Sequence, residues 1–221
     1  IVFGDWSSDV CSSDLNPTGR PNSDVVRPLV GAADLTGVPR QRWTIDFGLL
    51  PCSQACLYEA PFAHVEKLVL PIRSGNRRAS YAQRWWQFAE ARPRLRQALR
   101  GMPVCLATPC HSKHRVFVPV NAESLCDQAT IVFARADDYF LGVLHSRLHE
   151  VWALELGTRL ETRPRYTPTT CFETFPFPWP PGQEPADSPL VREITAAAAE
   201  LCRLRDAWLN PPEWVREEVL E

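Results

Sequence analysis

One stretch of the chain constrains the fold more than any other, because a long helical pattern in it gives way to closely spaced prolines. Between residues 138 and 156 apolar side chains recur at three- and four-residue steps, which predicts one long helix. Its apolar face comprises Phe140, Val143, Leu144, Leu148, Val151, Trp152 and Leu156. Gly157 is placed to end the helix, and residues 170–175 can form a strand. Four prolines at residues 176–181 prevent a β-ladder beyond that strand.

The remaining periodic segments divide into strands and helices. The predicted strands are residues 25–30, 42–47, 104–108, 115–120 and 130–134. The predicted helices are residues 53–70, 77–89, 94–100 and 190–209. Pro61 should kink or split the first of these helices, and residues 34–37 read as a turn. The fold class is therefore mixed α+β, with an irregular twisted sheet and packed helices followed by a C-terminal helical segment.

The formal net charge of −2 hides an uneven distribution. Residues 16–180 contain 20 Lys and Arg against 14 Asp and Glu, whereas residues 181–221 contain 4 against 9. Residues 73–115 are the most basic block, with ten basic residues, one acid (Glu90) and a net charge of +9. A GC-rich genome would favour arginine over lysine, but it would not cluster the arginines. The clustering points to an anionic partner, since arginine contacts phosphate in a bidentate manner.

Composition also excludes two classes of protein. No apolar run approaches the roughly 18–20 residues of a membrane span, so no membrane partner is expected. Eight cysteines at irregular spacing do not suggest a disulfide scaffold. A reducing, cytoplasmic setting with free thiols is expected instead.

Several blocks of sequence resemble one known family, and they occur in the expected order over residues 16–181. The most specific blocks are LHSRLHEVWAL, GTRLE, PRYTPTT and FETFPFPWP. Upstream blocks include NPTGRPNSDVVRPLVGAADLTG, WTIDFG, LYEAPFAHV, NRRASYAQRWWQF and IVFARADDYF. Together they resemble the target-recognition domain of MmeI-like enzymes, which are single-chain restriction–modification proteins and DNA adenine methyltransferases.

The resemblance implies sequence-specific recognition of double-stranded DNA on behalf of an S-adenosylmethionine-dependent adenine-N6 DNA methyltransferase. The implied partners are double-stranded DNA and the methyltransferase domain of the same parent chain, in the bacterial cytoplasm. In a parent that also carries an endonuclease, the same domain would set the site of cleavage. A basic RNA-binding or scaffold module with no methyltransferase attached remains the alternative. The sequence upstream of Asn16 would distinguish the two.

Both ends of the chain look artificial or truncated. Residues 5–15, DWSSDVCSSDL, resemble the translation of a sequencing-library adapter, and a disordered leader is the alternative. The chain stops at Glu221 inside a helical pattern. The expected organisation is a leader at 1–15, a DNA target-recognition domain at 16–183, and the truncated start of a C-terminal helical domain at 184–221.

Catalytic and cofactor motifs are missing from the sequence. The ten glycines are scattered, so no glycine-rich loop is available for S-adenosylmethionine. The sequence Asn210-Pro211-Pro212-Glu213 places Glu213 where a methyltransferase that flips its target base needs an aromatic ring. Neither lysine has a glutamate two positions before it, as the common nuclease fold requires. We therefore expect no catalytic residue and no cofactor in this fragment, and S-adenosylmethionine in the parent enzyme.

Eleven residues are candidates for contact with DNA. They are Arg73, Arg77, Arg78, Arg84, Lys113, His114, Arg115, Arg147, Arg163, Arg165 and Tyr166. The basic block 73–115 would position the duplex through its phosphates, while side chains on loops would read base edges. Arg163, Arg165 and Tyr166 follow the long helix in a turn-rich segment, so we expect them on or beside a recognition loop. The alternative is that Arg165 pairs with an acid at the edge of the core, such as Glu173.

Metal binding is not expected. His111 and His114, with Cys105 and Cys110, lack the matched pairs that structural zinc sites show. On the long helix, His145, Arg147, His149 and Glu150 should fall largely off the apolar stripe. That polar face is expected to contact DNA or a neighbouring domain rather than a metal. The large aromatics favour a core position over stacking on bases: Trp85, Trp86, Trp152, Phe172, Phe175, Phe177 and Trp179.

Overall fold

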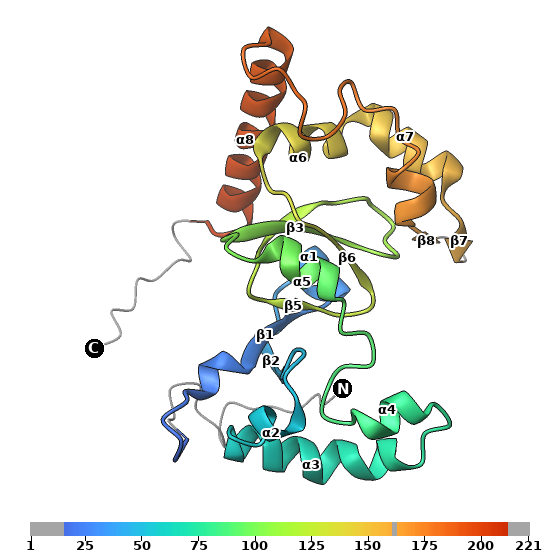
Figure 1. The fold of residues 1–221 in the computed structure, drawn as a ribbon. Coiled ribbons are helices and arrows are strands. Elements are labelled where there is room, and N and C mark those ends of the chain that lie inside the picture. The colour runs from blue at the N-terminus through green and yellow to red at the C-terminus, as the bar shows by residue number, and fades with distance from the viewer. Residues whose placement is uncertain (1–15, 161–162, 212–221) are drawn as a thin grey trace. The chain divides into compact units, whose positions relative to one another are not determined.

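The computed structural model describes residues 16–160 and 163–211 (Figure 1). Contacts divide these residues into two units. The first unit holds residues 16–109 and 120–134, and the second holds residues 110–119 and those from 135 onwards. Both units contain helices, and short strands occur throughout, so the predicted mixed α+β class is confirmed. The leader at 1–15 and the helix expected from Glu213 lie outside the described residues.

The strands form small separate sheets rather than one continuous sheet. In one sheet β1 (Val26–Val30) lies between β2 (Arg42–Ile45), its antiparallel neighbour, and β5 (Leu125–Cys126), its parallel neighbour. A second sheet has the order β4-β3-β6. Its strands are β4 (Val118–Asn121), β3 (Val104–Pro109) and β6 (Thr130–Phe133). The two-residue strand β5 was not predicted, because it is too short to show an alternating pattern.

The first helices of the first unit follow the turn η1 (Asn22–Asp24) and strand β1. The segment predicted as a turn at 34–37 forms a short helix, α1 (Ala32–Thr36), because the Asp34 carboxylate accepts a hydrogen bond from the Gly31 amide at 2.7 Å. The predicted helix at 53–70 is split into α2 (Cys52–Ala55) and α3 (Glu59–Ser74). The split confirms the expected effect of Pro61, which lies in the first turn of α3, where no helical hydrogen bond is lost.

The helix predicted at 77–89 is shorter than expected: α4 spans Ala79–Gln83. The chain leaves the helix because two side chains beyond it, Trp86 and Gln87, each donate a hydrogen bond to the Leu50 carbonyl at 2.9 Å. The next helix, α5 (Pro93–Leu99), agrees with the prediction and is followed by Gly101, whose φ of +78° suits glycine.

Aromatic side chains fill the core of the first unit. Phe47 and Tyr58 are buried there, and Phe62, Trp85 and Trp86 pack against them. The rings meet in tilted and edge-on pairs, with centroids 5.9 Å apart for Phe47 and Phe62 and for Trp85 and Trp86. The two tryptophans thus pack against the core as predicted, although each is only partly buried.

The long helix predicted at 138–156 is two helices, α6 (Asp138–His145) and α7 (Arg147–Leu156). The break lies at Ser146, whose extended backbone (ψ 150°) interrupts the helix. Its hydroxyl oxygen accepts a hydrogen bond from the His149 amide at 3.2 Å and so caps α7. A serine in the middle of an apolar-periodic segment can act as a cap, and here the local hydrogen bond prevails over continuous helical periodicity.

The break changes which face of α7 is buried. Leu148 is 77% exposed, and Val151 and Leu156 are exposed as well, although all three were placed on the apolar face. His149, which was expected off that face, is completely buried. The prediction failed because it extended the apolar pattern of α6 through Ser146 into α7. One helix ends at this residue and a second helix begins after it.

The segment after α7 forms a hairpin and an irregular turn. Gly157 follows the last helical residue as expected, but its role is close packing: a Cβ there would lie 2.5 Å from the Ala153 carbonyl oxygen. Strand β7 (Arg159–Leu160) then pairs with β8 (Arg163–Pro164). The strand predicted at 170–175 was wrong, because this segment is a π-helical turn, η2 (Pro168–Phe172).

The last helix of the second unit, α8 (Pro189–Leu209), matches the prediction. It packs against α6 at Gly142, where a Cβ atom would lie 2.7 Å from Ile194 Cγ2 and 3.2 Å from Ala198 Cβ. Nearby, Tyr139, Val143 and Phe175 form a buried cluster. Trp152, Phe177, Trp179, Val191 and Ile194 cover this cluster. The predicted core role of the aromatics in this region is confirmed.

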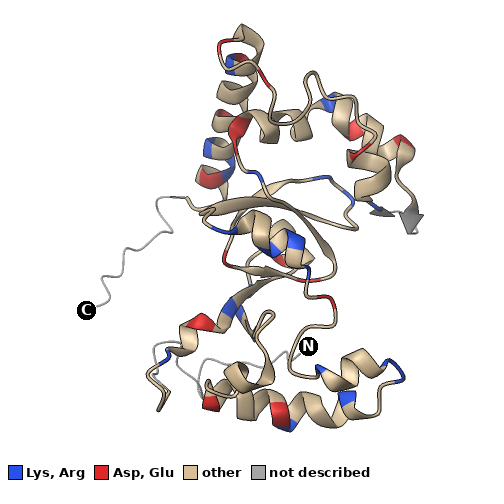
Figure 2. Ribbon diagram, in the orientation of Figure 1, with Lys and Arg blue, Asp and Glu red and all other residues tan. Residues whose placement is uncertain are grey.

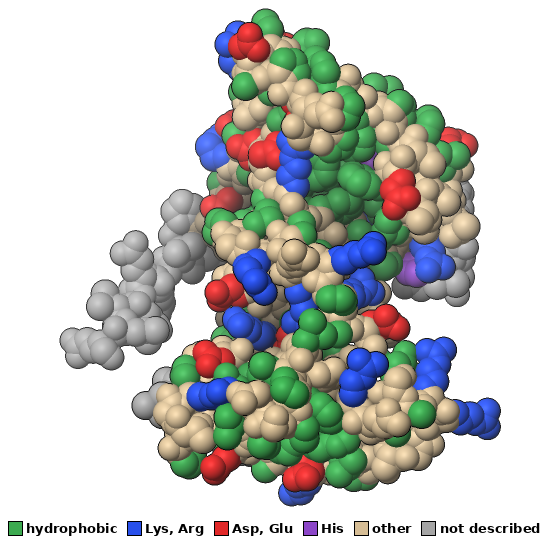
Figure 3. All heavy atoms as spheres, in the orientation of Figure 1, with side chains coloured by type: hydrophobic (Ala, Val, Ile, Leu, Met, Phe, Trp, Pro, Cys, Tyr) green, Lys and Arg blue, Asp and Glu red, His purple; other side chains and the backbone are tan. Residues whose placement is uncertain are grey.

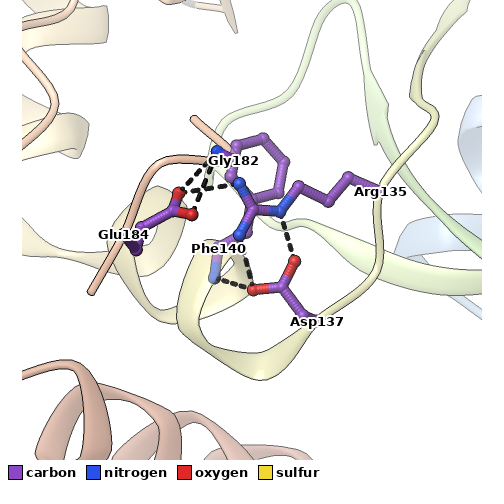
Figure 4. A network of polar contacts seen from close by, with 5 residues as sticks. All are labelled: Arg135, Asp137, Phe140, Gly182 and Glu184. Atoms are coloured by element: carbon purple, nitrogen blue, oxygen red, sulfur yellow. Dashed lines mark hydrogen bonds and ion pairs between the residues drawn. The ribbon is translucent and has the colours of Figure 1, made fainter. Parts of the chain in front are cut away.

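A network of polar contacts fixes the linker before α8 to the start of α6 (Figure 4). The Arg135 guanidinium pairs with the Asp137 carboxylate and, at 2.8 Å, with Glu184. Asp137 caps α6 through the Phe140 amide, and the Gly182 amide donates to both oxygens of Glu184 at 3.0 Å. The segment predicted as a linker at 183–189 is therefore held in place by charge-assisted hydrogen bonds.

In the described part of the chain no helix is long and apolar enough to cross a membrane. The seven cysteines between residues 16 and 211 are free thiols.

Candidate nucleic-acid interface

The exposed arginines of the first unit gather around α4 and α5, where Figure 2 shows basic residues in blue and Figure 3 shows them at the molecular surface. Arg77, Arg78 and Arg84 flank α4, and all three are exposed. The Arg78 guanidinium lies 5.3 Å from the centroid of the Tyr81 ring and donates to its hydroxyl at 2.9 Å. Tyr81 thereby holds one cation of the group in a defined position.

Two arginines of the basic block serve the structure of the first unit instead. Arg73 donates to the backbone carbonyls of Trp85 and Gln87, and burial lowers its pKa. Arg96 forms a bidentate pair with the nearly buried Asp46 at 2.6 and 2.9 Å. Arg73 was a candidate DNA contact; the structure shows its guanidinium engaged in joining the end of α3 to the segment after α4.

The second unit brings several other candidates together around one small pocket. Its lining residues are Ser112, Lys113, Arg115, Glu150, Ala153, Leu154, Pro164, Arg165 and Tyr166. Three of them are cations, whereas Glu150 is the one acid, and its carboxylate pairs with Arg147 at 2.5 Å. The lining thus combines three cations with the apolar side chains of Ala153, Leu154 and Pro164.

Backbone contacts join the two segments that form this pocket. Arg165 forms a β-bridge with His111, and the Tyr166 amide donates to the Cys110 carbonyl at 2.8 Å. On the other side of the same strand, the Arg165 amide donates to the Thr158 carbonyl at 2.7 Å. Residues that are more than 40 positions apart in the sequence, Lys113 and Arg165, therefore lie at one site.

Tyr166, a candidate for contact with DNA, does not reach the surface. Its side chain is 1% exposed, and its hydroxyl lies 3.1 Å from Nε2 of His149. The Arg115 guanidinium covers the ring at 4.9 Å from the centroid, and burial raises the pKa of the phenol. Phe117 approaches the same ring edge-on at 5.7 Å. In this conformation Tyr166 can support the pocket from below but cannot contact a duplex.

His149 is the residue of this region that the sequence did not reveal. Its Nδ1 lies 2.8 Å from the Leu144 carbonyl oxygen, so Nδ1 carries the proton and Nε2 accepts from the Tyr166 hydroxyl. Burial lowers the pKa of His149, the hydrogen bond to Leu144 opposes this shift, and the charge of Arg115 adds to it. The signal available in the sequence was Ser146, a helix cap three residues earlier that places His149 inward.

The remaining candidates lie apart from the pocket or at its edge. His114 and Arg147 are exposed, and the second is held in its ion pair with Glu150. Arg163 is paired through its backbone with Leu160 in the β7–β8 hairpin. No ion pair joins Arg165 to Glu173 in the described residues, so the alternative of a pair between them finds no support.

In the described ranges, no group of three or more His, Cys, Asp or Glu side chains is arranged so that it could hold a metal ion. His145 accepts a hydrogen bond from the Phe117 amide through Nε2 at 3.0 Å. Burial, followed by the charges of Arg205 and His149, lowers its pKa to about 4. Both histidines of α6 and α7 are therefore neutral structural groups near neutral pH.

Comparison with known proteins identifies the family. The family model described as "MmeI, target recognition domain" matches residues 12–179. DNA methyltransferase A of Bacillus subtilis (strain 168) is 34% identical over 70 residues, which are 30% of this chain and 8% of that protein. The fold matches a solved structure of the Type IIL restriction–modification enzyme MmeI in complex with DNA, with a TM-score of 0.65 at 20% identity over 86% of this chain.

The chain covers only part of both relatives: 24% of the solved MmeI chain and 8% of the methyltransferase. The family model, in contrast, matches well over half of this chain, including the arginines around α4 and the whole of the pocket. The chain belongs to the MmeI target recognition domain family.

Proposed function

We propose that this chain recognises a specific sequence in double-stranded DNA for a restriction–modification methyltransferase. The observation that carries the proposal is the match of the MmeI target recognition domain over residues 12–179. The solved structure with the same fold is of an enzyme in complex with DNA, and the relative from Bacillus subtilis is a DNA methyltransferase. The alternative of an RNA-binding or scaffold module gains no support from these relatives.

The exposed arginines of the first unit are proposed to hold the duplex by its phosphates. Arg77, Arg78 and Arg84 are surface cations that flank one short helix, α4, and Lys113 and His114 are exposed in the second unit. Contacts of this kind supply affinity and register but no sequence information. Arg73 contributes to this surface indirectly, by fixing the end of α3.

Arg165 is proposed to read a base edge. It is exposed, lines a pocket and projects from a short strand whose backbone is held on both sides. A rigidly supported arginine suits the bidentate contact to guanine in the major groove. Arg163 lies two residues away in the same strand segment and is proposed to support or share this role.

The parent protein is proposed to be an adenine-N6 methyltransferase of the bacterial cytoplasm that uses S-adenosylmethionine. Within it, residues 16–183 would be the target-recognition domain and residues 184–221 the start of a helical domain. No glycine-rich loop occurs in this sequence, so the cofactor and the flipped adenine would be held by another part of the parent.

A gel-shift titration of the 221-residue chain tests the proposal. Mixed-sequence duplex DNA should be bound with a dissociation constant on the order of 10⁻⁴–10⁻⁶ M at physiological salt, and more tightly at low salt. A parallel incubation with labelled S-adenosylmethionine should transfer no label. Failure to shift duplex DNA even at low salt, or a clear preference for RNA of the same length, would contradict the proposed function.

A further inference from the structure

We propose that His149 is a positioning residue for DNA recognition: through its buried hydrogen bond to Tyr166 it sets the orientation of Arg165 at the pocket. The inference rests on the proposed function and adds a residue that is not itself exposed. It concerns a chain of contacts from α7 to the strand that carries Arg165, all within the second unit.

The first step is the direction of the side chains. In an extended strand successive side chains point to opposite faces, and residue 165 lies in a β-bridge with His111. Tyr166 is fully buried, whereas its neighbour Arg165 is exposed and lines the rim of the pocket that Tyr166 also borders. Whatever anchors Tyr166 inward therefore also holds Arg165 outward, and a slip of one residue would exchange the two.

The second step is the anchor itself. The Tyr166 hydroxyl donates to Nε2 of His149, while Nδ1–H of the same ring donates to the Leu144 carbonyl. The imidazole is thus a fixed connection between the last turn of α6 and the strand. Phe175 packs edge-on against the ring at 4.7 Å, which leaves it one orientation.

The third step is the reason for a polar pair at this position. An apolar pair of similar shape could fill the same space at little or no loss of stability. A buried donor and acceptor instead satisfy each other in a single arrangement, and therefore specify one register of the strand. The Arg115 guanidinium over the Tyr166 ring, with Nη2 directed to the Pro164 carbonyl at 3.4 Å, adds a second restraint on the residues next to Arg165.

Substitution of Tyr166 by Phe tests the inference with little disturbance, because the ring beneath Arg115 remains and only the hydroxyl is lost. His149→Gln is a second variant, which removes the ring but keeps a donor and an acceptor. Tyr139→Phe is the matched control: Tyr139 lies in the same unit, is 4% exposed, and has a buried hydroxyl with no hydrogen-bond partner among the described residues.

The first measurement does not involve DNA. Amide hydrogen exchange should become faster at Arg165 and Tyr166 in Tyr166→Phe, since these amides hold the strand in register, and should be unchanged in Tyr139→Phe. Amides of β3 and β6 in the first unit serve as an internal reference. Unchanged exchange at both strand positions in Tyr166→Phe and His149→Gln would overturn the positioning role.

The second measurement is a double-mutant cycle on duplex binding. Tyr166→Phe should lower the preference for the duplex selected from a random pool over mixed-sequence duplex about two- to tenfold, the effect of one buried hydrogen bond, and should add nothing when Arg165 is already alanine. Additive effects of the two substitutions would overturn the inference while leaving the proposed function intact. Absence of duplex binding by the unaltered chain would overturn the proposed function, and with it this role in recognition, whatever the exchange data show.

Discussion

The Tyr166 hydroxyl lies 3.1 Å from Nε2 of His149 in α7, and both side chains are buried. This contact places a tyrosine expected at the DNA surface inside the second unit. It also explains the burial of His149, which was expected on a polar helix face in contact with DNA or a neighbouring domain. The chemical consequence is that the residue next to Tyr166, Arg165, is presented outward on a rigid support.

Neutralising Arg77, Arg78 and Arg84 together should weaken binding to all duplexes alike. Each phosphate contact that is lost should flatten the slope of log K against log salt concentration by about 0.9. Titrations at four salt concentrations measure this slope. The matched control neutralises three exposed cations outside the candidate set, Lys67, Arg192 and Arg203. Equal slopes for the triple variant and the unaltered chain would rule out this phosphate-binding surface.

Substitution of Arg165 by Ala should change which sequence is preferred rather than affinity in general. A bidentate arginine–guanine contact is worth about 1–3 kcal/mol of discrimination, so one position of the site should lose its base preference. Selection from a random duplex pool followed by sequencing measures this. Arg192→Ala, an exposed arginine of α8, is the control. An unchanged selected sequence would show that Arg165 does not read a base.

Substitution of Gly142 by Ala should destabilise the second unit by up to about 2 kcal/mol. Alanine would improve helix propensity by about 1 kcal/mol, but its Cβ would lie 2.7 Å from Ile194 Cγ2 and 3.0 Å from the Ile194 carbonyl, and overpacking of this kind costs about 1–3 kcal/mol. Urea unfolding measures the difference. Gly75→Ala is the control, since a Cβ there meets nothing within 4 Å. A more stable Gly142→Ala variant would contradict the close packing of α6 and α8.

Substitution of Glu184 by Gln should loosen the linker before α8. Burial raises the pKa of Glu184, but the hydrogen bonds from Arg135 and the Gly182 amide outweigh it, and the pKa lies below its ordinary value. This group therefore contributes stability above the unfolded pKa near 4.5, and the contribution is lost as pH falls through the lower folded pKa. Unfolding at pH 7 should show a loss of roughly 1.5–3 kcal/mol in the variant, typical of hydrogen bonds to charged groups. Equal stability at pH 7 would refute the role of this network.

Acidification should destabilise the second unit through His145. Its pKa is about 4 in the folded chain against 6.5 for the free side chain, because burial and the charges of Arg205 and His149 disfavour the cation. Because the unfolded chain binds this proton at a higher pH than the folded chain, the free energy of unfolding is highest above pH 6.5. It declines as the pH falls towards 4, by a total on the order of 3 kcal/mol. In His145→Gln this decline should be smaller over the same window. Identical pH profiles of the two proteins would exclude His145 as the titrating group.

The sequence by itself determined the family, the mixed α+β class and most individual elements, because these depend on local patterns. Helix α8, the split shortly before Pro61 and strand β6 follow from periodicity and proline chemistry over a few residues. The recurrence of several ordered blocks identified the family before any contact was known. The core role of the large aromatics followed from their size alone.

The tertiary structure decided which side chains point inward and which come together. The Ser146 cap rotated the buried face of α7, so that Leu148 is exposed and His149 is buried. The apolar periodicity of the sequence could not reveal which face of α7 is buried. That periodicity assumes one continuous helix, and the hydrogen bond from the His149 amide to Ser146 starts a new helix instead. The pocket likewise needs backbone pairing between segments far apart in the chain, and no local pattern records that Lys113 and Arg165 share it.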